Sequence, residues 1–321
     1  MFKIFENKLP LWGFLLVLCV PYLVIFMMPY TEALFFLCIA AGLYGIIKEK
    51  CRLYFVGFLL ASMTKASASI LIPVFLFAEI ISATYHRKPL FFLARFGKRI
   101  LPVVLGLLCV MVFQKLRGAE NFHQFFISQK IWGKYLSLPT LPFTDWSSEG
   151  KSITDPFLLL YSIPMVVVLL RAFLRGLKRK EGEKITIWQY TRLISLLFLT
   201  GNIFTALLTQ HGGLYSLARY LLSTPFFVFL LFDTVKNRRN KIWEAVYAFV
   251  GLITVVLCIY NFVKADFAGT WLVMLGSLLA FFHRKFGKRV LYFALAAGIL
   301  LNICWTAYMF NCFLLDAWIF T

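Results

Sequence analysis

Long apolar runs, separated by short polar or basic segments, follow one another along almost the whole chain. A helix that crosses a bilayer needs about 20 mainly apolar residues, because its backbone amides must bond internally in hydrocarbon. The runs therefore predict an all-α fold, a polytopic transmembrane helical bundle of about ten or eleven spans in a single domain over residues 1–321. The candidate spans are residues 11–28, 31–47, 53–64, 67–84, 99–114, 155–174, 187–208, 219–234, 242–262, 268–282 and 289–311.

Three segments depart from this regular pattern. The run 53–64 is short, and we expect it to be a half-span paired with 67–84 across a break around Thr64 and Lys65. We see no matching break in the second half of the chain. Residues 89–99 mix Phe and Leu with basic residues, which predicts an amphipathic helix on the membrane surface. Residues 115–154 are rich in aromatic side chains, and we expect one or two helices lying on the outer, non-cytoplasmic face.

Composition supports a membrane protein. Hydrophobic residues make up 61% of the chain and charged residues 15%, whereas soluble domains carry about 25% charged residues. The net charge of +19 comes from short basic clusters between apolar runs, so we assign it to membrane lipids and not to nucleic acid. With the N-terminus placed in the cytoplasm, Lys and Arg are about three times as frequent in inner as in outer segments, which favours that orientation.

Common catalytic motifs are absent from the chain, and no metal or cofactor is indicated. The seven cysteines include no CxxC pair, and we interpret them as small core residues. His283 lies in a basic inner loop, where we expect it to be solvated. A carboxylate in or near hydrocarbon is a functional candidate by default. For Glu79 and Glu244, which lie near basic inner loops, we favour snorkelling or pairing with a neighbour. For Glu32 both a functional role and such a plain interfacial role stay open.

Four ordered motifs carry a resemblance to a known family. The first is PYTEALF at 29–35, and the second is the small-residue run GFLLASMTKASASILIPVFLF at 57–77. The third is FHQFFISQKIWGKYLSLPTLPF at 122–143, and the fourth is SLARYLLSTPFFVFLL at 216–231. Together they resemble the PIG-V-like mannosyltransferases of the GT-C superfamily over about residues 10–235.

The resemblance implies an activity and a site. Enzymes of this superfamily move a sugar from a polyprenyl or dolichyl phosphate to an acceptor hydroxyl, which needs a carboxylate as base and cations for the leaving phosphate. We expect this donor, a GT-C-like bundle, and a pocket at the non-cytoplasmic face. The residues expected there are Tyr30, Lys65, Gln129, Trp132, Arg219 and Tyr220.

Three of these residues, Arg219, Lys65 and Trp132, have an expected role and a plainer alternative. Arg219, next to Tyr220, would hold the lipid phosphate bidentately, or else anchor a span at the interface. Lys65 would hold the phosphate as a point charge, or else be merely interfacial. Gln129 and Trp132 would line the sugar pocket, or else Trp132 belongs to an aromatic belt.

The chain also departs from the family pattern. The family places its catalytic Asp in the first outer loop, but here no Asp precedes Asp145. We therefore expect a truncated chain, a fragment, or a member without that catalytic step. The catalytic residue is unknown, and Glu32 is a weak candidate.

Two other functions compete with sugar transfer. One is a transporter or flippase of a lipid-linked saccharide, and the other is an accessory subunit with a membrane protein partner. The lack of an Asn-x-Ser/Thr sequon favours the bacterial inner membrane over the endoplasmic reticulum.

Overall fold

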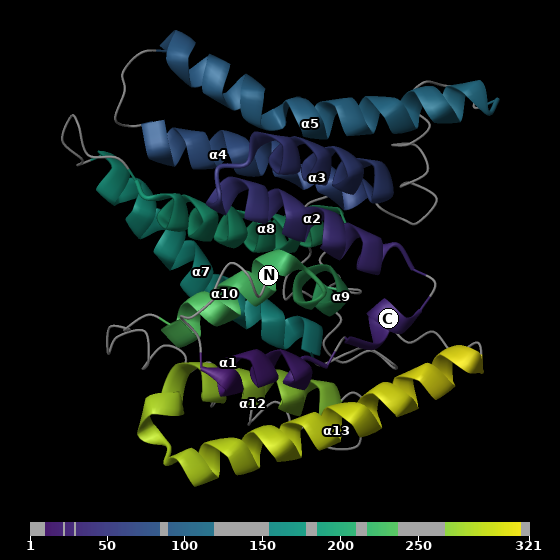
Figure 1. Ribbon diagram of the computed structural model, residues 1–321, viewed down its shortest axis with the longest axis vertical. Helices are drawn as coiled ribbons and strands as arrows, with labels where there is room; N and C mark the ends of the chain where they lie inside the picture. The colour runs from purple at the N-terminus through teal and green to yellow at the C-terminus, as the bar shows by residue number, and fades with distance from the viewer. Residues whose placement is uncertain are drawn as a thin grey trace. The chain divides into compact units, whose positions relative to one another are not determined.

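The described part of the chain is helical. The computed structural model describes residues 10–21, 23–28, 30–83, 89–118, 154–177, 185–209, 217–236 and 267–315, and no strand occurs among them (Figure 1). Three helices in these ranges are long and apolar enough to cross a membrane, namely Phe92–Leu116, Ile187–Thr209 and Lys288–Leu314. The prediction of an all-α protein with membrane-spanning helices is thus confirmed for the described residues.

The chain divides into two compact units. Unit 1 comprises chiefly Thr31–Pro139 and Met165–His211, and unit 2 comprises Phe2–Tyr30, Thr140–Pro164 and Gly212–Thr321. The chain passes between the units at several points, and one of these boundaries falls inside helix α7, Thr154–Leu177, directly after Pro164.

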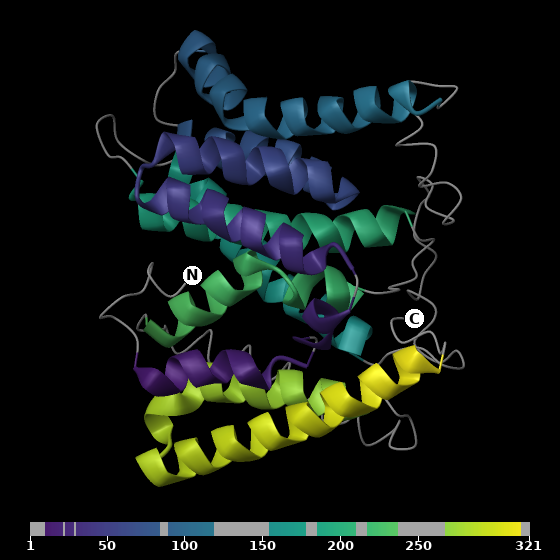
Figure 2. The same ribbon diagram turned by 45° about the vertical axis from the view of Figure 1, so that its right-hand side comes forward.

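Unit 1 is built in layers. Figure 2 shows α5 along one side of α3 and α4, and α2 and α8 along their other side. The elements are α2 (Glu32–Ile47), α3 (Cys51–Thr64), the 3-10 helix η4 (Ala66–Ile70), α4 (Leu71–Ala83), α5 (Pro89–Leu116) and α8 (Ile187–Thr209). The α-helices among them are rich in Leu, Ile, Val and Phe, so each can bury one side and leave another for lipid.

Glycines bring α2 and α3 close together. A Cβ atom on Gly57 would lie 2.5 Å from the backbone nitrogen of Gly42, and one on Gly45 would lie 2.3 Å from that of Tyr54. Small residues permit such close approach of helices in membranes. The turn between α2 and α3 is tight, since Glu49 there adopts a φ of 54°.

Residues 89–99 do not form a separate surface helix. They are the first part of α5, which continues without a break to Leu116 and contains Pro102. The hydroxyl of Tyr54 on α3 donates a hydrogen bond to the carbonyl of Arg99, close to this proline. The basic residues thus occupy one end of a helix that is itself a candidate span.

Unit 2 is built around the two C-terminal helices of the described chain. Its elements are α1 (Leu11–Leu15), the 3-10 helices η2 (Leu16–Cys19) and η3 (Leu23–Met27), α9 (Leu217–Leu222), α10 (Pro225–Lys236), α12 (Phe267–Phe282), η5 (His283–Lys285) and α13 (Lys288–Leu314). One apolar cluster joins α1, η2, α10, α12 and α13, and its buried members are Trp12, Leu16, Cys19, Val235, Leu279, Ala280, Leu291 and Leu295.

The predicted span 11–28 is not one helix, and Pro21 gives the reason. Proline has no N–H and forces the preceding residue out of the α region, and Val20 is accordingly extended, with ψ at 119°. The interruption leaves carbonyls without helical donors. The Nδ2 of Asn302 on α13 donates to the carbonyls of Leu18 at 2.6 Å and Val20 at 3.0 Å.

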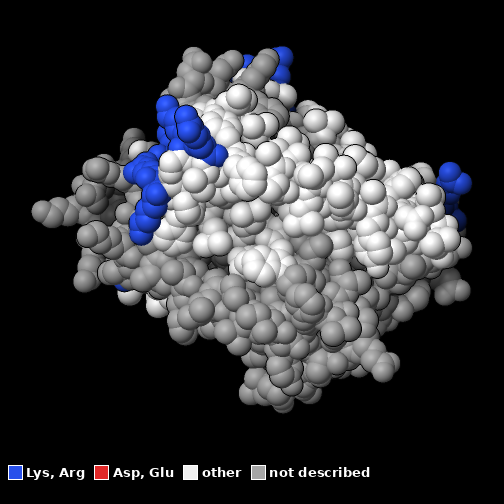
Figure 3. Space-filling model, turned by 90° about the horizontal axis from the view of Figure 1, so that it is seen from below, with Lys and Arg blue, Asp and Glu red and all other residues white. Residues whose placement is uncertain are grey.

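Basic residues gather at the turn between α12 and α13. Figure 3 shows Lys and Arg side chains over η5 and the start of α13, and no Asp or Glu of the described residues is visible on this face. The exposed basic residues of this turn are Arg284, Lys285, Lys288 and Arg289.

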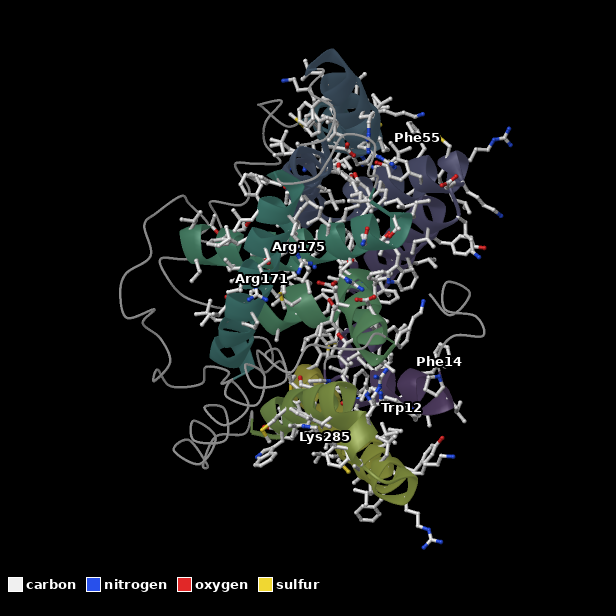
Figure 4. The ribbon with its side chains drawn as sticks, turned by 90° about the vertical axis from the view of Figure 1, so that its left-hand side faces the viewer. Trp12, Phe14, Phe55, Arg171, Arg175 and Lys285 are labelled. Carbon is white, nitrogen blue, oxygen red and sulfur yellow. The ribbon has the colours of Figure 1, made fainter. Side chains whose placement is uncertain are left out.

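His283, at the same turn, is half-buried and not fully solvated as expected. Its ring lies 4.5 Å from that of Trp12 on α1, and its Nδ1 lies 3.1 Å from the carbonyl oxygen of Ala280. Figure 4 labels Trp12 on α1 and Lys285 on the turn. Burial lowers the pKa of His283 below 6.5, and the neighbouring charge of Arg284 lowers it further, although the Ala280 carbonyl raises it.

The cysteines are only partly core residues. Cys19 and Cys38 are buried, as expected, but Cys51, Cys109 and Cys304 are exposed. Cys109 and Cys304 lie on candidate spans, where an exposed side chain contacts lipid at no polar cost.

Candidate functional site

A buried ion pair joins the start of α2 to the break after α3. The Nζ of Lys65 lies 2.9 Å from Oε1 of Glu32, with the Glu32 side chain 1% exposed and that of Lys65 15% exposed. The predicted break is confirmed, since α3 ends at Thr64 and η4 begins at Ala66. Lys65 itself is extended, with φ −148° and ψ 132°. An isolated charge in hydrocarbon is costly, so the pairing explains how both side chains are tolerated here.

Local structure holds this pair in place. Glu32 is the first residue of α2, where the helix dipole favours a negative charge. At the other partner, the hydroxyl of Thr64, the last residue of α3, donates to the carbonyl of Ala61 at 2.8 Å. The ammonium group of Lys65 also lies 5.8 Å from the ring centroid of Phe35, a weak cation–π contact. The less buried partner, Lys65, is the one that a ligand would meet first.

Unit 2 contains a second cationic contact. The guanidinium carbon of Arg219, on α9, lies 4.4 Å from the ring centroid of Tyr30. Tyr30 in turn packs edge-on against Phe313, with ring centroids 6.2 Å apart. Arg219 and its neighbour Tyr220 are both half-buried. The cation–π contact with Tyr30 helps to hold the guanidinium group in place, which would favour a phosphate contact.

A second interruption follows Arg219, where none was expected. The predicted span 219–234 is divided into α9 and α10, with Ser223 and Thr224 between them. The Thr224 hydroxyl accepts a hydrogen bond from the N–H of Phe227 at 3.4 Å, and Pro225 is the first residue of α10. A threonine cap followed by proline is a typical helix start. That signal was present in the sequence but was hidden inside an apolar run.

A third cluster surrounds Glu79, whose side chain is fully buried on α4. It has two ion pairs, with Arg95 Nε at 3.1 Å and Arg99 Nε at 3.9 Å. The hydroxyl of Tyr190 on α8 donates to its Oε1 at 2.6 Å. Glu79 therefore pairs with neighbours, as favoured from the sequence, although its partners come from two other helices.

The structure brings the predicted site residues together in pairs. Glu32 and Lys65 meet within unit 1, and Tyr30 and Arg219 meet within unit 2. Gln129 and Trp132, with most of the loop 115–154, lie outside the described residues, as does Glu244. The expected convergence on one pocket stays a prediction.

The described fold defines a helical protein with at least three helices able to cross a bilayer and with charged pairs set among apolar helices. Comparison of the chain with protein-family models, with curated proteins and with solved structures found no match. The resemblance in the four sequence motifs is therefore a hypothesis about function, to be judged by the chemistry of the pairs.

Proposed function

We propose that the chain is an integral membrane glycosyltransferase of the GT-C type, with a mannosyltransferase-like donor, a polyprenyl or dolichyl phosphate sugar. The observation that carries the proposal is the Glu32–Lys65 pair at the interruption between α3 and η4. A cation fixed at a helix break, among apolar helices, suits the phosphate of a lipid donor.

In this proposal Lys65 contacts the donor phosphate and Glu32 positions Lys65. The acceptor hydroxyl gives its proton to a base and attacks C1 of the sugar, the bond from C1 to the phosphate oxygen breaks, and the lipid phosphate leaves with that electron pair. Lys65 stabilises the negative charge on the leaving phosphate. Glu32 is held by the ammonium group and is almost fully buried, so it suits positioning better than proton abstraction. Glu32 is therefore not the base in this proposal.

Arg219 is the second proposed phosphate ligand, held in place by its cation–π contact with Tyr30. The proposed topology keeps the finer sequence-based expectations. These are about ten or eleven spans, a cytoplasmic N-terminus, a site at the non-cytoplasmic face and a location in the bacterial inner membrane.

A transfer assay tests this function. Purified protein in lipid would be given a radiolabelled polyprenyl-phosphate mannose and an acceptor, and product formation would be compared among wild type, Lys65→Met and Arg219→Ala. Lys285→Met, at the exposed η5 turn, is the matched control. Loss of transfer of about a hundredfold in the first two variants, with the control unchanged, supports the proposal. Equal transfer in all four proteins contradicts it.

A transporter or flippase of a lipid-linked saccharide is the second candidate. It is favoured by the two interruptions, after α3 and after α9, because transporters build binding sites from broken helices. Translocation of a fluorescent lipid-linked sugar in vesicles, without any transfer, would select it. An accessory subunit would instead show neither activity unless a second membrane protein is added.

A further inference from the structure

The Glu79 cluster gathers polar side chains from four helices of unit 1. Glu79 lies on α4, Arg95 and Arg99 on α5, Tyr190 on α8 and Tyr54 on α3. Along α4 and η4, Glu79 is 14 positions from Lys65, which corresponds to about 20 Å of helical rise. The cluster is thus a separate site from the Glu32–Lys65 pair.

The cluster holds more positive than negative charge. Among the described residues, the carboxylate of Glu79 forms ion pairs with the guanidinium groups of both Arg95 and Arg99. The two arginines are four residues apart on α5, so their like charges repel one another. Glu79 offsets part of this repulsion, and a second anion at the same place would offset the rest. The positive charge of the two guanidinium groups attracts an anion, although solvent screens this attraction where the side chains are exposed.

The arginines are also held in fixed positions. The guanidinium carbon of Arg99 lies 5.3 Å from the ring centroids of both Tyr54 and Tyr190. Both ion pairs to Glu79 use the Nε atom, on the side of the guanidinium group nearest the helix. Guanidinium groups fixed in this way lose little entropy when they bind a phosphate bidentately.

An anion arriving from outside would meet the arginines and not the carboxylate. The side chains of Arg95 and Arg99 are 37% and 32% exposed, whereas that of Glu79 is 0% exposed. The carboxylate of Glu79, which would repel an anion, is therefore shielded. The guanidinium groups of Arg95 and Arg99, which would attract it, are accessible.

Apolar side chains lie on the same turns of α5. The rings of Phe92 and Phe96 are stacked, with centroids 6.3 Å apart and planes 10° from parallel, and Leu93 is 58% exposed. Phe92 is also the first residue of a candidate span. A ligand bound here would have a phosphate at the arginines and a hydrocarbon part beside the aromatic rings.

We propose that Arg95 and Arg99 form a binding site for the phosphate headgroup of an anionic phospholipid. Each guanidinium group donates to phosphate oxygens, and Phe92, Leu93 and Phe96 contact the acyl chain. Glu79 acts as a positioning residue, which holds the two cations at the spacing that the phosphate needs.

Lipid retention by the whole protein tests the site. The full-length chain would be purified from micelles containing equal amounts of phosphatidylglycerol and phosphatidylcholine, and the lipids retained would be counted by native mass spectrometry. Wild type should prefer phosphatidylglycerol, and the double variant Arg95→Gln/Arg99→Gln should reduce that preference about tenfold. The double variant Lys288→Gln/Arg289→Gln removes the same charge from an exposed helix start and should retain the wild-type preference.

Three results would overturn the proposal. One is a wild-type protein without preference for phosphatidylglycerol, another is an unchanged preference in Arg95→Gln/Arg99→Gln, and the third is an equal loss in the Lys288→Gln/Arg289→Gln control. If Arg95→Gln/Arg99→Gln does not fold, the variant Arg95→Lys/Arg99→Lys tests the site in its place. It keeps both positive charges beside Glu79 but loses the bidentate geometry of the guanidinium groups. A several-fold lower preference then supports the site, and an unchanged preference contradicts it.

Inorganic phosphate distinguishes a lipid from a free anion. Millimolar phosphate should leave the retained phosphatidylglycerol in place, because the acyl chain adds apolar contacts that free phosphate lacks. Complete displacement at millimolar phosphate would show that the apolar side chains contribute nothing, and would overturn the assignment to a lipid.

Discussion

Replacing Lys65 with Met should destabilise the protein more than replacing its partner Glu32 with Gln. The two charged atoms are 2.9 Å apart, so their attraction is about 6 kcal/mol at an effective dielectric constant of 20. Desolvation offsets much of this, yet removal of one partner from a buried pair costs about 3–5 kcal/mol, because the other charge stays buried.

The exposures of the two side chains predict the asymmetry. Lys65→Met leaves a carboxylate that is 1% exposed, so its cost should be near the upper value, about 4 kcal/mol. Glu32→Gln leaves an ammonium group that is 15% exposed and carried on a flexible stem, which can move towards water. Its cost should be about 1–2 kcal/mol. The double variant removes both charges and should be more stable than Lys65→Met alone.

These differences in unfolding free energy are measured by reversible unfolding in mixed detergent micelles, with tryptophan fluorescence as the signal. The double-mutant cycle compares wild type, the two single variants and the double variant. Lys285→Met at the exposed η5 turn serves as control and should change the free energy of unfolding by less than about 0.5 kcal/mol. The reasoning is refuted if Lys65→Met costs no more than Glu32→Gln, or if the two costs simply add in the double variant.

Three further outcomes follow from the geometry. Gly57→Ala should cost about 3 kcal/mol or more in unfolding free energy, because its Cβ would lie 2.5 Å from the backbone of Gly42, and a cost under 1 kcal/mol would contradict the packing. Glu49→Gly should stabilise by about 1 kcal/mol, since only glycine adopts a φ of 54° without strain, and thermal unfolding in detergent would detect it. The lowered pKa of His283 means that the unfolded chain binds more protons, so the melting temperature should fall as pH decreases below about 6.5 and through the folded pKa. His283→Gln should flatten this pH dependence, and an equal slope in wild type and variant would show that another group titrates.

Helix breaks show where sequence reasoning succeeded and where it failed. The break at Lys65 was predicted because a charged residue interrupts the apolar run there. The break at Pro21 was missed, because every neighbour is apolar and a count of apolar residues does not register one proline. The interruption before Pro225 was missed for the same reason, although Thr224 and Pro225 form a recognisable helix start.

Partners of charged residues could not be predicted. The sequence indicated that Glu79 lies near basic residues, but its ion pairs and its hydrogen bond come from α5 and α8. Glu32 and Lys65 were each predicted as separate site residues, and their pairing depends on how α2 packs against the end of α3. Likewise, the continuity of α5 from Pro89 to Leu116 follows from its packing against α3 and α4, and not from the charges at its start.

The sequence by itself determined that this is a helical protein with membrane-spanning segments, because apolar composition and run length act locally and do not depend on the partners of each helix. It also placed costly charges at Glu32, Lys65 and Glu79. Only the tertiary structure decided which opposite charge each of them meets, and that His283 packs against Trp12. Such contacts join residues from distant parts of the chain, and their geometry is set by the close approach of whole helices.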